Sequence, residues 1–166
     1  MSAPIHRISP TLDLINCTSI DSIIDVRSPS EFLDDHMPNA INLPVLDDVQ
    51  RESIGTIHSQ SSPFEAKRAG AALVAQNLSL HLQTTLADKD RNWRPLIYCW
   101  RGGHRSGAMA KIFSDIGWHT KVIEGGYKAY RKTVLDGLDQ LPQQFQLVLL
   151  SGATGTAKTY ILRAAA

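Results

Sequence analysis

The chain has 166 residues, of which 43% are hydrophobic and 20% are charged, and its formal net charge is +1. These values fit one soluble globular domain, with room for a fragment of a second. The balanced charge excludes binding to nucleic acid or membrane through the charge of the whole molecule, so such binding would need a local patch. The longest apolar run is far shorter than the ~20 residues that span a bilayer.

Two cysteines, Cys17 and Cys99, are too few for a disulfide framework. The N-terminal segment MSAPIHRISP lacks the apolar stretch of a secretory signal peptide. We therefore expect a cytoplasmic protein whose thiols are free. The histidines and cysteines do not have the spacing of metal ligands, so we predict no metal site.

Short apolar runs and a helical pattern alternate in the first part of the chain. The run SIIDV at Ser22–Val26 predicts a strand because β-branched residues dominate it. Ser30 follows as a candidate N-cap of a short helix that would bury Phe32 and Leu33. The run AINLP at Ala40–Pro44 predicts a second strand, which its proline ends.

A long helix is predicted after a polar, irregular segment at 45–62, which we interpret as a loop. Pro63 suits the first helical position, and Ser62 and Glu65 have the spacing of a capping box. Apolar residues then recur at helical spacing. They are Phe64, Ala71, Leu73, Val74, Leu78, Leu82 and Leu86.

The next elements follow the same alternation. The run PLIYC at Pro95–Cys99 predicts a buried strand, and a helix is predicted from about Ser106 to a stop at Gly117. The segment HTKVIEGG predicts another strand and a turn, and YKAYRKTVLDGLDQL predicts a last helix. Strands that alternate with helices predict an α/β fold with a mostly parallel sheet flanked by helices.

A domain boundary is predicted near residue 141. The segment LPQQ resembles a linker, and FQLVLLSGATGTAKTYIL then predicts a strand that enters a glycine-rich turn. We therefore predict a first domain at 1–140 and, at 145–166, the first strand and turn of an incomplete P-loop domain. Ala157 occupies the position where a phosphate-binding loop has glycine, which is tolerable only if its φ is negative. The candidate phosphate-binding residues of this segment are Gly152, Gly155, Lys158 and Thr159.

Cys99 has the most informative surroundings in the sequence, YCWRGGHRSG. Two glycines after the predicted strand let backbone N–H groups turn toward one centre, and such a nest at a helix N-terminus favours a thiolate. Arg105 adds a cation whose fork suits phosphate-like oxyanions. The pattern predicts a nucleophilic sulfur that faces an anionic donor, rather than a cysteine that only packs behind the strand. The candidate donor-binding residues are Trp100, Arg101, Gly102, Gly103, His104, Arg105 and Ser106.

Two further segments carry a resemblance to a known family. IIDVRSPSEFLDDHMPNAINLP resembles the first signature of rhodanese-type sulfurtransferases, VIEGGYKAYR resembles their closing signature, and Cys99 falls where their persulfide cysteine lies. The loop from Cys99 to Arg105 has the length seen in cysteine phosphatases and is one residue longer than in typical rhodaneses. A longer loop makes a wider pocket, able to hold a tetrahedral oxyanion or a larger chalcogen.

The ordered set of CxRGGxRS, EGGYKAYR and the Walker-like GATGTAKT resembles the tRNA 2-selenouridine synthases over about residues 20 to 162. The resemblance implies a rhodanese-like fold, a chain truncated at its C-terminus, and a transferase that replaces sulfur by selenium in wobble 2-thiouridine of tRNA. It implies selenophosphate and geranyl diphosphate as substrates, a geranylated 2-thiouridine intermediate and no tightly bound cofactor. Cys99 would be the nucleophile that handles the chalcogen, while Arg101, Arg105 and the loop amides hold the charge of selenophosphate.

Other functions stay open from the sequence. The loop length also fits a cysteine phosphatase of rhodanese fold, although Tyr98 stands where many phosphatases have histidine. A general rhodanese sulfurtransferase and an inactive remnant that serves as a binding module are further alternatives.

Several other polar residues receive structural interpretations. We interpret Asp25 and Arg27 as a structural pair, His104 as a solvated donor rather than a general acid, and Cys17 as core. Trp100 fits a base-stacking surface and half-buried rim packing equally well. A group of basic residues could meet tRNA phosphate, but a solvated helix face is the better interpretation. These residues are Lys121, Lys128, Arg131 and Lys132.

Overall fold

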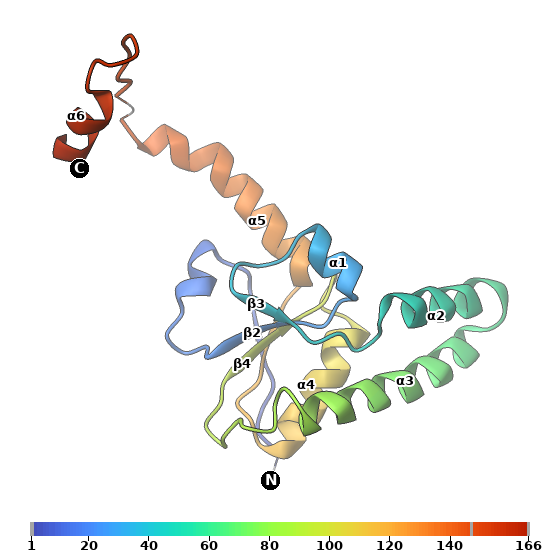
Figure 1. Cartoon of the computed structure of the whole chain (residues 1–166). Coiled ribbons are helices and arrows are strands. Elements are labelled where there is room, and N and C mark those ends of the chain that lie inside the picture. The colour runs from blue at the N-terminus through green and yellow to red at the C-terminus, as the bar shows by residue number, and fades with distance from the viewer. Residues whose placement is uncertain (1, 147, 166) are drawn as a thin grey trace. The chain divides into compact units, whose positions relative to one another are not determined.

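The structure, a computed structural model, describes residues 2–146 and 148–165 (Figure 1). The chain divides into two compact units, Met1–Leu135 and Asp136–Ala166. The helix α5 (Gly126–Gln140) begins in the first unit and ends in the second.

The first unit is built on a five-stranded sheet in which every neighbouring pair is parallel. Its registers place Ile24 beside Ile97 and Ile97 beside Val122, so β-branched residues line up across the centre of the sheet. The α/β class with a mostly parallel sheet is therefore confirmed. In spatial order the strands are β1 (His6–Ile8), β5 (Lys121–Ile123), β4 (Pro95–Tyr98), β2 (Ser22–Asp25) and β3 (Ala40–Asn42).

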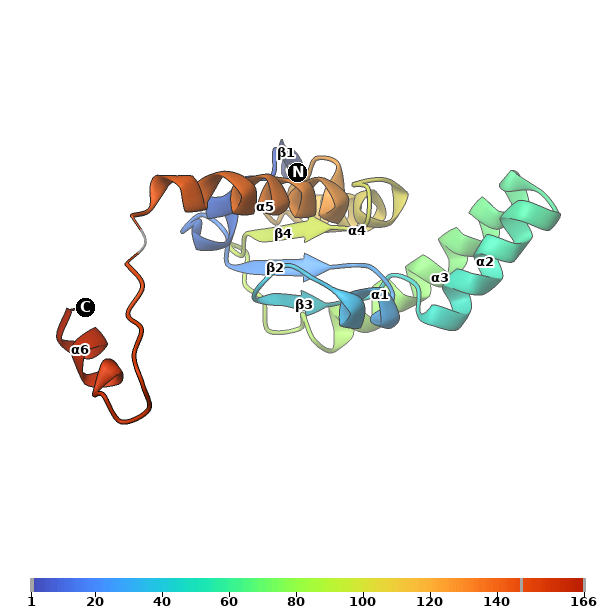
Figure 2. The same cartoon turned by 90° about the horizontal axis from the view of Figure 1, so that it is seen from above.

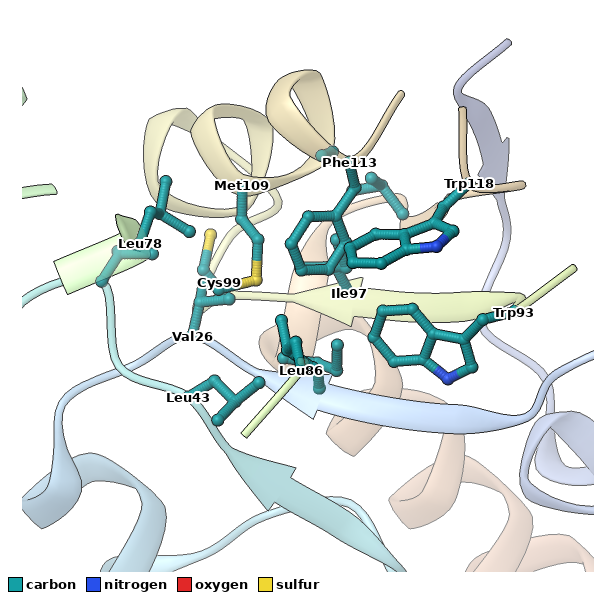
Figure 3. Packing of buried hydrophobic residues seen from close by; sticks show 14 residues of the cluster. Val26, Leu43, Leu78, Leu86, Trp93, Ile97, Cys99, Met109, Phe113 and Trp118 are labelled. Carbon is teal, nitrogen blue, oxygen red and sulfur yellow. The ribbon is translucent and has the colours of Figure 1, made fainter. Parts of the chain in front are cut away.

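The two faces of the sheet are covered by different helices. Residues that alternate along β2 and β4 point to opposite faces, so Ile24 and Ile97 pack on one face while Ile23 and Leu96 pack on the other. One face packs against α3 (Pro63–Gln83) and α4 (His104–Ile116), and Figure 3 shows Cys99 and Met109 meeting there, between the sheet and α4. The other face packs against the start of α5 through Tyr127 and Tyr130.

The short helix α1 (Pro29–Asp34) starts differently from the prediction. Its N-cap is Ser28 rather than Ser30, because Pro29 takes the first helical position and Glu31 completes the capping box. The predicted burial is also wrong for Leu33, which is 81% exposed. Phe32 is half-buried and stacks on His36, with ring centroids 3.8 Å apart.

The predicted loop at 45–62 is wrong, because most of it forms the helix α2 (Asp48–Gln60). Asp47 caps this helix and forms a capping box with Gln50. Helices α2 and α3 lie side by side as an antiparallel hairpin in both views (Figures 1 and 2). None of the α2 side chains is buried, so its sequence lacks the apolar face by which a surface helix is usually predicted.

Two smaller expectations also need correction. Ser62 is the N-cap of α3, with Pro63 at the first position, but Glu65 pairs with Arg68 at 2.5 Å instead of completing a capping box. Cys17 is exposed rather than part of the core, because it follows a short 3-10 helix at Leu12–Asn16 on the surface. The stop of α4 at Gly117 is confirmed, since this glycine has φ 107°.

The second unit contains the end of α5, a 3-10 helix, a glycine-rich turn and a last helix, but no described strand. A 3-10 helix occupies Leu141–Gln144, where a linker was predicted, and α6 (Lys158–Ala165) follows the glycine-rich turn. The predicted strand is absent from residues 148–150, and residue 147 lies outside the described residues. Val148 and Leu149 are 88% and 90% exposed, so no described strand covers them. No described helix of either unit is long and apolar enough to cross a membrane.

Candidate cysteine-loop active site

Cys99 directly follows β4 at the edge where the parallel strands end. Its side chain is 3% exposed, and its sulfur accepts a hydrogen bond from the Gly103 N–H at 3.3 Å. The Ser106 hydroxyl lies 3.2 Å from the same sulfur. The loop thus turns a backbone N–H toward the sulfur at the start of α4, as the glycine pattern predicts.

The loop closes through glycines of two separate segments. Gly102 has φ 66°, and a Cβ there would lie 2.8 Å from the Ile123 carbonyl oxygen. Gly126 has φ 63°, and a Cβ there would overlap the Cys99 carbonyl and the Gly102 nitrogen. Both positions therefore require glycine, because the two backbones touch with no room for a side chain.

The N-terminus of α5 holds the cysteine loop from the other side. The Tyr127 N–H donates to the Cys99 carbonyl at 2.8 Å, and the Lys128 N–H donates to the Trp100 carbonyl at 3.0 Å. Free N–H groups at a helix start are thus satisfied by the loop that precedes α4. Sequence reasoning missed this role, although the paired glycines at 125–126 were a usable signal for a close backbone approach.

The predicted structural pair of Asp25 and Arg27 is confirmed. Both side chains are buried, and Arg27 Nη2 lies 2.6 Å from Asp25 Oδ2. The guanidinium lies 4.2 Å from the centroid of the Tyr127 ring, so it also packs under the start of α5. Burial alone would lower the pKa of Arg27, but the hydrogen bonds and charge of Asp25 outweigh burial and raise it.

Arg105 is held by a residue that sequence reasoning did not select. Its Nη1 and Nη2 lie 2.5 Å and 3.3 Å from the two carboxylate oxygens of Glu31 in α1. Burial opposes ionisation of Glu31, but the hydrogen bonds and charge of Arg105, with Ser28 and Arg51, lower its pKa. No local pattern predicts this contact, because its two ends are 74 residues apart.

The other predicted loop residues fall into two groups. Arg101 and His104 are exposed, and Ser106 is buried beside the sulfur. Trp100 is 37% exposed, with its ring centroid 5.9 Å from that of Tyr127, so it lies at the rim. The basic residues considered as a patch do not all lie on one element. Lys121, in β5, donates a hydrogen bond to Ser19, whereas Lys128, Arg131 and Lys132 are exposed on α5.

A pocket of about 870 Å³ lies between the α2–α3 hairpin and the cysteine loop. Gly102, Gly103 and Gly107 form part of its wall, and none of the described acidic residues lines it. Its apolar lining comes from Leu46, Ile54, Ala66, Ala71, Val74 and Ala108. Its basic and imidazole lining comes from Arg7, His58, Lys67, His104 and Arg105.

The second glycine-rich loop has a different geometry. Lys158 Nζ donates to the carbonyls of Gly152 and Ala153, at 2.8 Å and 2.6 Å, within its own loop. Gly155 has φ 87°, and Ala157 has φ 53° in the left-handed region. Ala157 therefore does not meet the condition of a negative φ, and alanine is strained where glycine would not be.

The side chains that could ligate a metal ion are dispersed over the fold. Among residues 2–146 and 148–165, no three histidine, cysteine, aspartate or glutamate side chains come together as a metal-binding group.

A parallel α/β sheet whose central strand ends in a cysteine loop, at the start of a helix, is the architecture of a sulfurtransferase-type domain. The sequence matches the rhodanese-like domain over residues 10–133. The chain therefore belongs to the rhodanese-like family.

Curated relatives resemble the same region of the chain. The chain is 33% identical over 142 residues to a tRNA 2-selenouridine synthase of Psychromonas ingrahamii, and the match covers 86% of this chain and 39% of that protein. It is 37% identical over 142 residues to a tRNA 2-selenouridine synthase of Proteus mirabilis, with 85% and 39% covered. The chain thus spans about two fifths of the length of these curated relatives.

A solved structure resembles the same region. It is the N-terminal domain of a protein from Clostridium difficile 630 that has been classed with ATP/GTP-binding proteins. The TM-score is 0.65 at 32% identity, and the match covers 80% of this chain and 99% of that one.

Proposed function

We propose that the chain supplies the cysteine-loop part of a tRNA 2-selenouridine synthase, a transferase that replaces sulfur by selenium in wobble 2-thiouridine of tRNA. The observation that carries the proposal is the position of Cys99 beneath the Gly103 N–H and beside Ser106, in a chain related to enzymes of that name. Cys99 is the nucleophile, selenophosphate is the donor, and Arg101 and Arg105 with the loop amides hold the charge of the donor.

The test is intact-mass analysis after incubation with selenophosphate, beside Cys99→Ser. An adduct on the parent protein that is absent from the variant supports the proposal, and the lack of any adduct on a free Cys99 thiol overturns it. Attack at selenium places selenium on sulfur and expels the phosphorus as phosphite. Attack at phosphorus places a phosphoryl group on sulfur and expels hydroselenide, so the adduct mass and the by-product identify the bond that breaks.

The pocket beside the loop supports geranyl diphosphate as a second substrate. An apolar wall from the α2–α3 hairpin suits a prenyl chain, and a lining with basic but no described acidic side chains suits a diphosphate. The proposal predicts that Ala71→Trp, which fills the pocket, weakens binding of geranyl diphosphate at least tenfold. Ala72→Trp is the matched control, because Ala72 is exposed on the same helix and does not line the pocket.

The geometry favours this proposal over a cysteine phosphatase. Tyr98, which stands where many phosphatases have histidine, is fully buried, and its hydroxyl accepts the Met37 N–H at 3.1 Å on the sheet face opposite the sulfur. We expect no turnover of a generic aryl phosphate. Multiple turnovers that Cys99→Ser abolishes would instead assign the loop to phosphate ester hydrolysis.

A further inference from the structure

Among the described acidic residues, Glu31 alone hydrogen-bonds to a residue of the cysteine loop, Arg105, and the proposed chemistry gives it no role. It lies in the first turn of α1, and its side chain is only 16% exposed. The backbone N–H and hydroxyl of Ser28 both donate to its Oε2, at 3.2 Å and 3.3 Å. These two bonds hold the carboxylate against the N-cap residue of its own helix.

The same carboxylate joins two arginines from separate helices. Arg105 of α4 contacts both of its oxygens, and Arg51 Nε of α2 lies 3.2 Å from Oε2. Arg105 is 23% exposed and Arg51 is 51% exposed, so the contact with Arg105 is the better shielded of the two. Glu31 therefore links the start of α4, which carries the cysteine loop, to the α2–α3 hairpin, which forms the other pocket wall.

The contact leaves Arg105 able to bind a second anion. A guanidinium has five N–H donors, and Glu31 uses two of them, so three remain. Arg105 also lines the pocket, and none of the described acidic side chains, Glu31 included, lines it. A bidentate partner fixes the plane of the guanidinium, because both Nη atoms are engaged.

We propose that Glu31 is a positioning residue that fixes Arg105, through their bidentate contact, to present its free N–H groups to the anionic donor. This inference rests on the proposed function for the identity of the donor. Glu31 acts through Arg105 and does not touch the donor itself.

The sign of its effect distinguishes this role from simple electrostatics. A carboxylate near an anion site repels the anion, so its removal should strengthen anion binding if charge alone matters. If Glu31 fixes Arg105, its removal should weaken anion binding, because a mobile arginine must be ordered by the ligand. We expect the second outcome.

The experiment measures how inorganic thiophosphate protects Cys99 from alkylation in the full chain, with the alkylated site read by peptide mass. A Cys17→Ser background removes the exposed thiol. The variants are Glu31→Gln, Arg105→Gln and the double variant. Asp48→Asn is the matched control, because Asp48 also joins α1 to α2, through Ser30 at 2.5 Å, without touching Arg105.

We expect Glu31→Gln to weaken thiophosphate binding about tenfold, and the double variant to bind no more weakly than Arg105→Gln alone. Asp48→Asn should bind as the parent does. Unchanged or tighter binding by Glu31→Gln, additive effects in the double variant, or no protection of the parent would each overturn the inference. Thiophosphate binding is measured without selenium transfer, so Glu31-dependent protection in a chain that forms no adduct would reject the proposed function and leave this inference standing.

Discussion

The chain contains two glycine-rich loops that each precede a helix, and they differ in the structure that supports them. The loop after Cys99 follows a strand that is buried on both faces, and α5 donates two backbone N–H groups to its carbonyls. The loop that leads to Lys158 follows no described strand, and the lysine satisfies its own loop carbonyls. Similar composition therefore gives a loop fixed by the core in one place and a self-contained turn in the other.

The difference shows that glycines allow backbone N–H groups to turn toward one centre but do not by themselves hold them there. Gly102 faces the backbone of β5 and of the start of α5, and Gly126 faces the backbone of the cysteine loop, so neither position with its positive φ has space for a Cβ. At Gly155 no described atom lies within 4 Å of the point that a Cβ would occupy, so the turn is set by local bonds alone. The first loop should thus respond to changes in the core, and the second should respond only to changes within itself.

The largest effect is expected when the buried pair behind the first loop is broken. Asp25→Asn leaves the Arg27 charge buried without its counter-ion, which costs about 3–5 kcal/mol of unfolding free energy. Urea denaturation measures this loss. Asp21→Asn is the control, because the Asp21–Arg94 pair lies at the surface, where solvent screens it, and its loss should cost much less.

A smaller but more local effect is expected at the contact between the loop and α5. Gly126→Ala adds both a clash with the Cys99 carbonyl and a positive φ for alanine, at a cost of about 2 kcal/mol or more. The alkylation rate of Cys99 should also change in this variant. Gly155→Ala imposes a positive φ without a clash, so it should leave the Cys99 alkylation rate unchanged; an equal response to both changes would contradict the distinction between the loops.

The Glu31 link predicts a pH dependence in the first unit. The folded pKa of Glu31 is lowered, so its stabilisation is fully present above the unfolded value of ~4.3 and is lost as pH falls through the folded pKa. We expect a contribution of about 1 kcal/mol. Urea titrations at pH 6 and pH 3 compare the parent with Glu31→Gln. An equal loss of stability in both proteins would show that other carboxylates account for the acid sensitivity.

The smallest effect is expected in the second loop. Ala157→Gly removes the strain of a positive φ, worth about 1 kcal/mol, without altering any contact of the first unit. A glycine also lets the backbone approach a phosphate closely, so we expect the change to strengthen binding of inorganic pyrophosphate several-fold in a calorimetric titration. Lys158→Ala in the same background should abolish the gain, and a gain that survives this change would place the pyrophosphate elsewhere.

The sequence was most informative where local pattern and long-range structure agree. Strands β2 and β4 and the setting of Cys99 are predictable because short apolar runs and a glycine pair specify them locally. The helix α2 was missed because its stability comes from caps and from packing on α3, with no buried side chain of its own. Glu31 was missed for a related reason, because its role depends on contacts with two arginines that are distant along the chain.

The bonds from Tyr127 and Lys128 to the loop carbonyls also affect the order in which the site can assemble during synthesis. A nascent chain that has emerged only as far as β5 already contains every residue from Cys99 to Ser106. It lacks the two donors and the glycine contact that close the loop. The thiol should therefore stay unshielded on the ribosome until α5 emerges, and a chain stalled before Gly126 would carry a complete sequence for the loop without its structure.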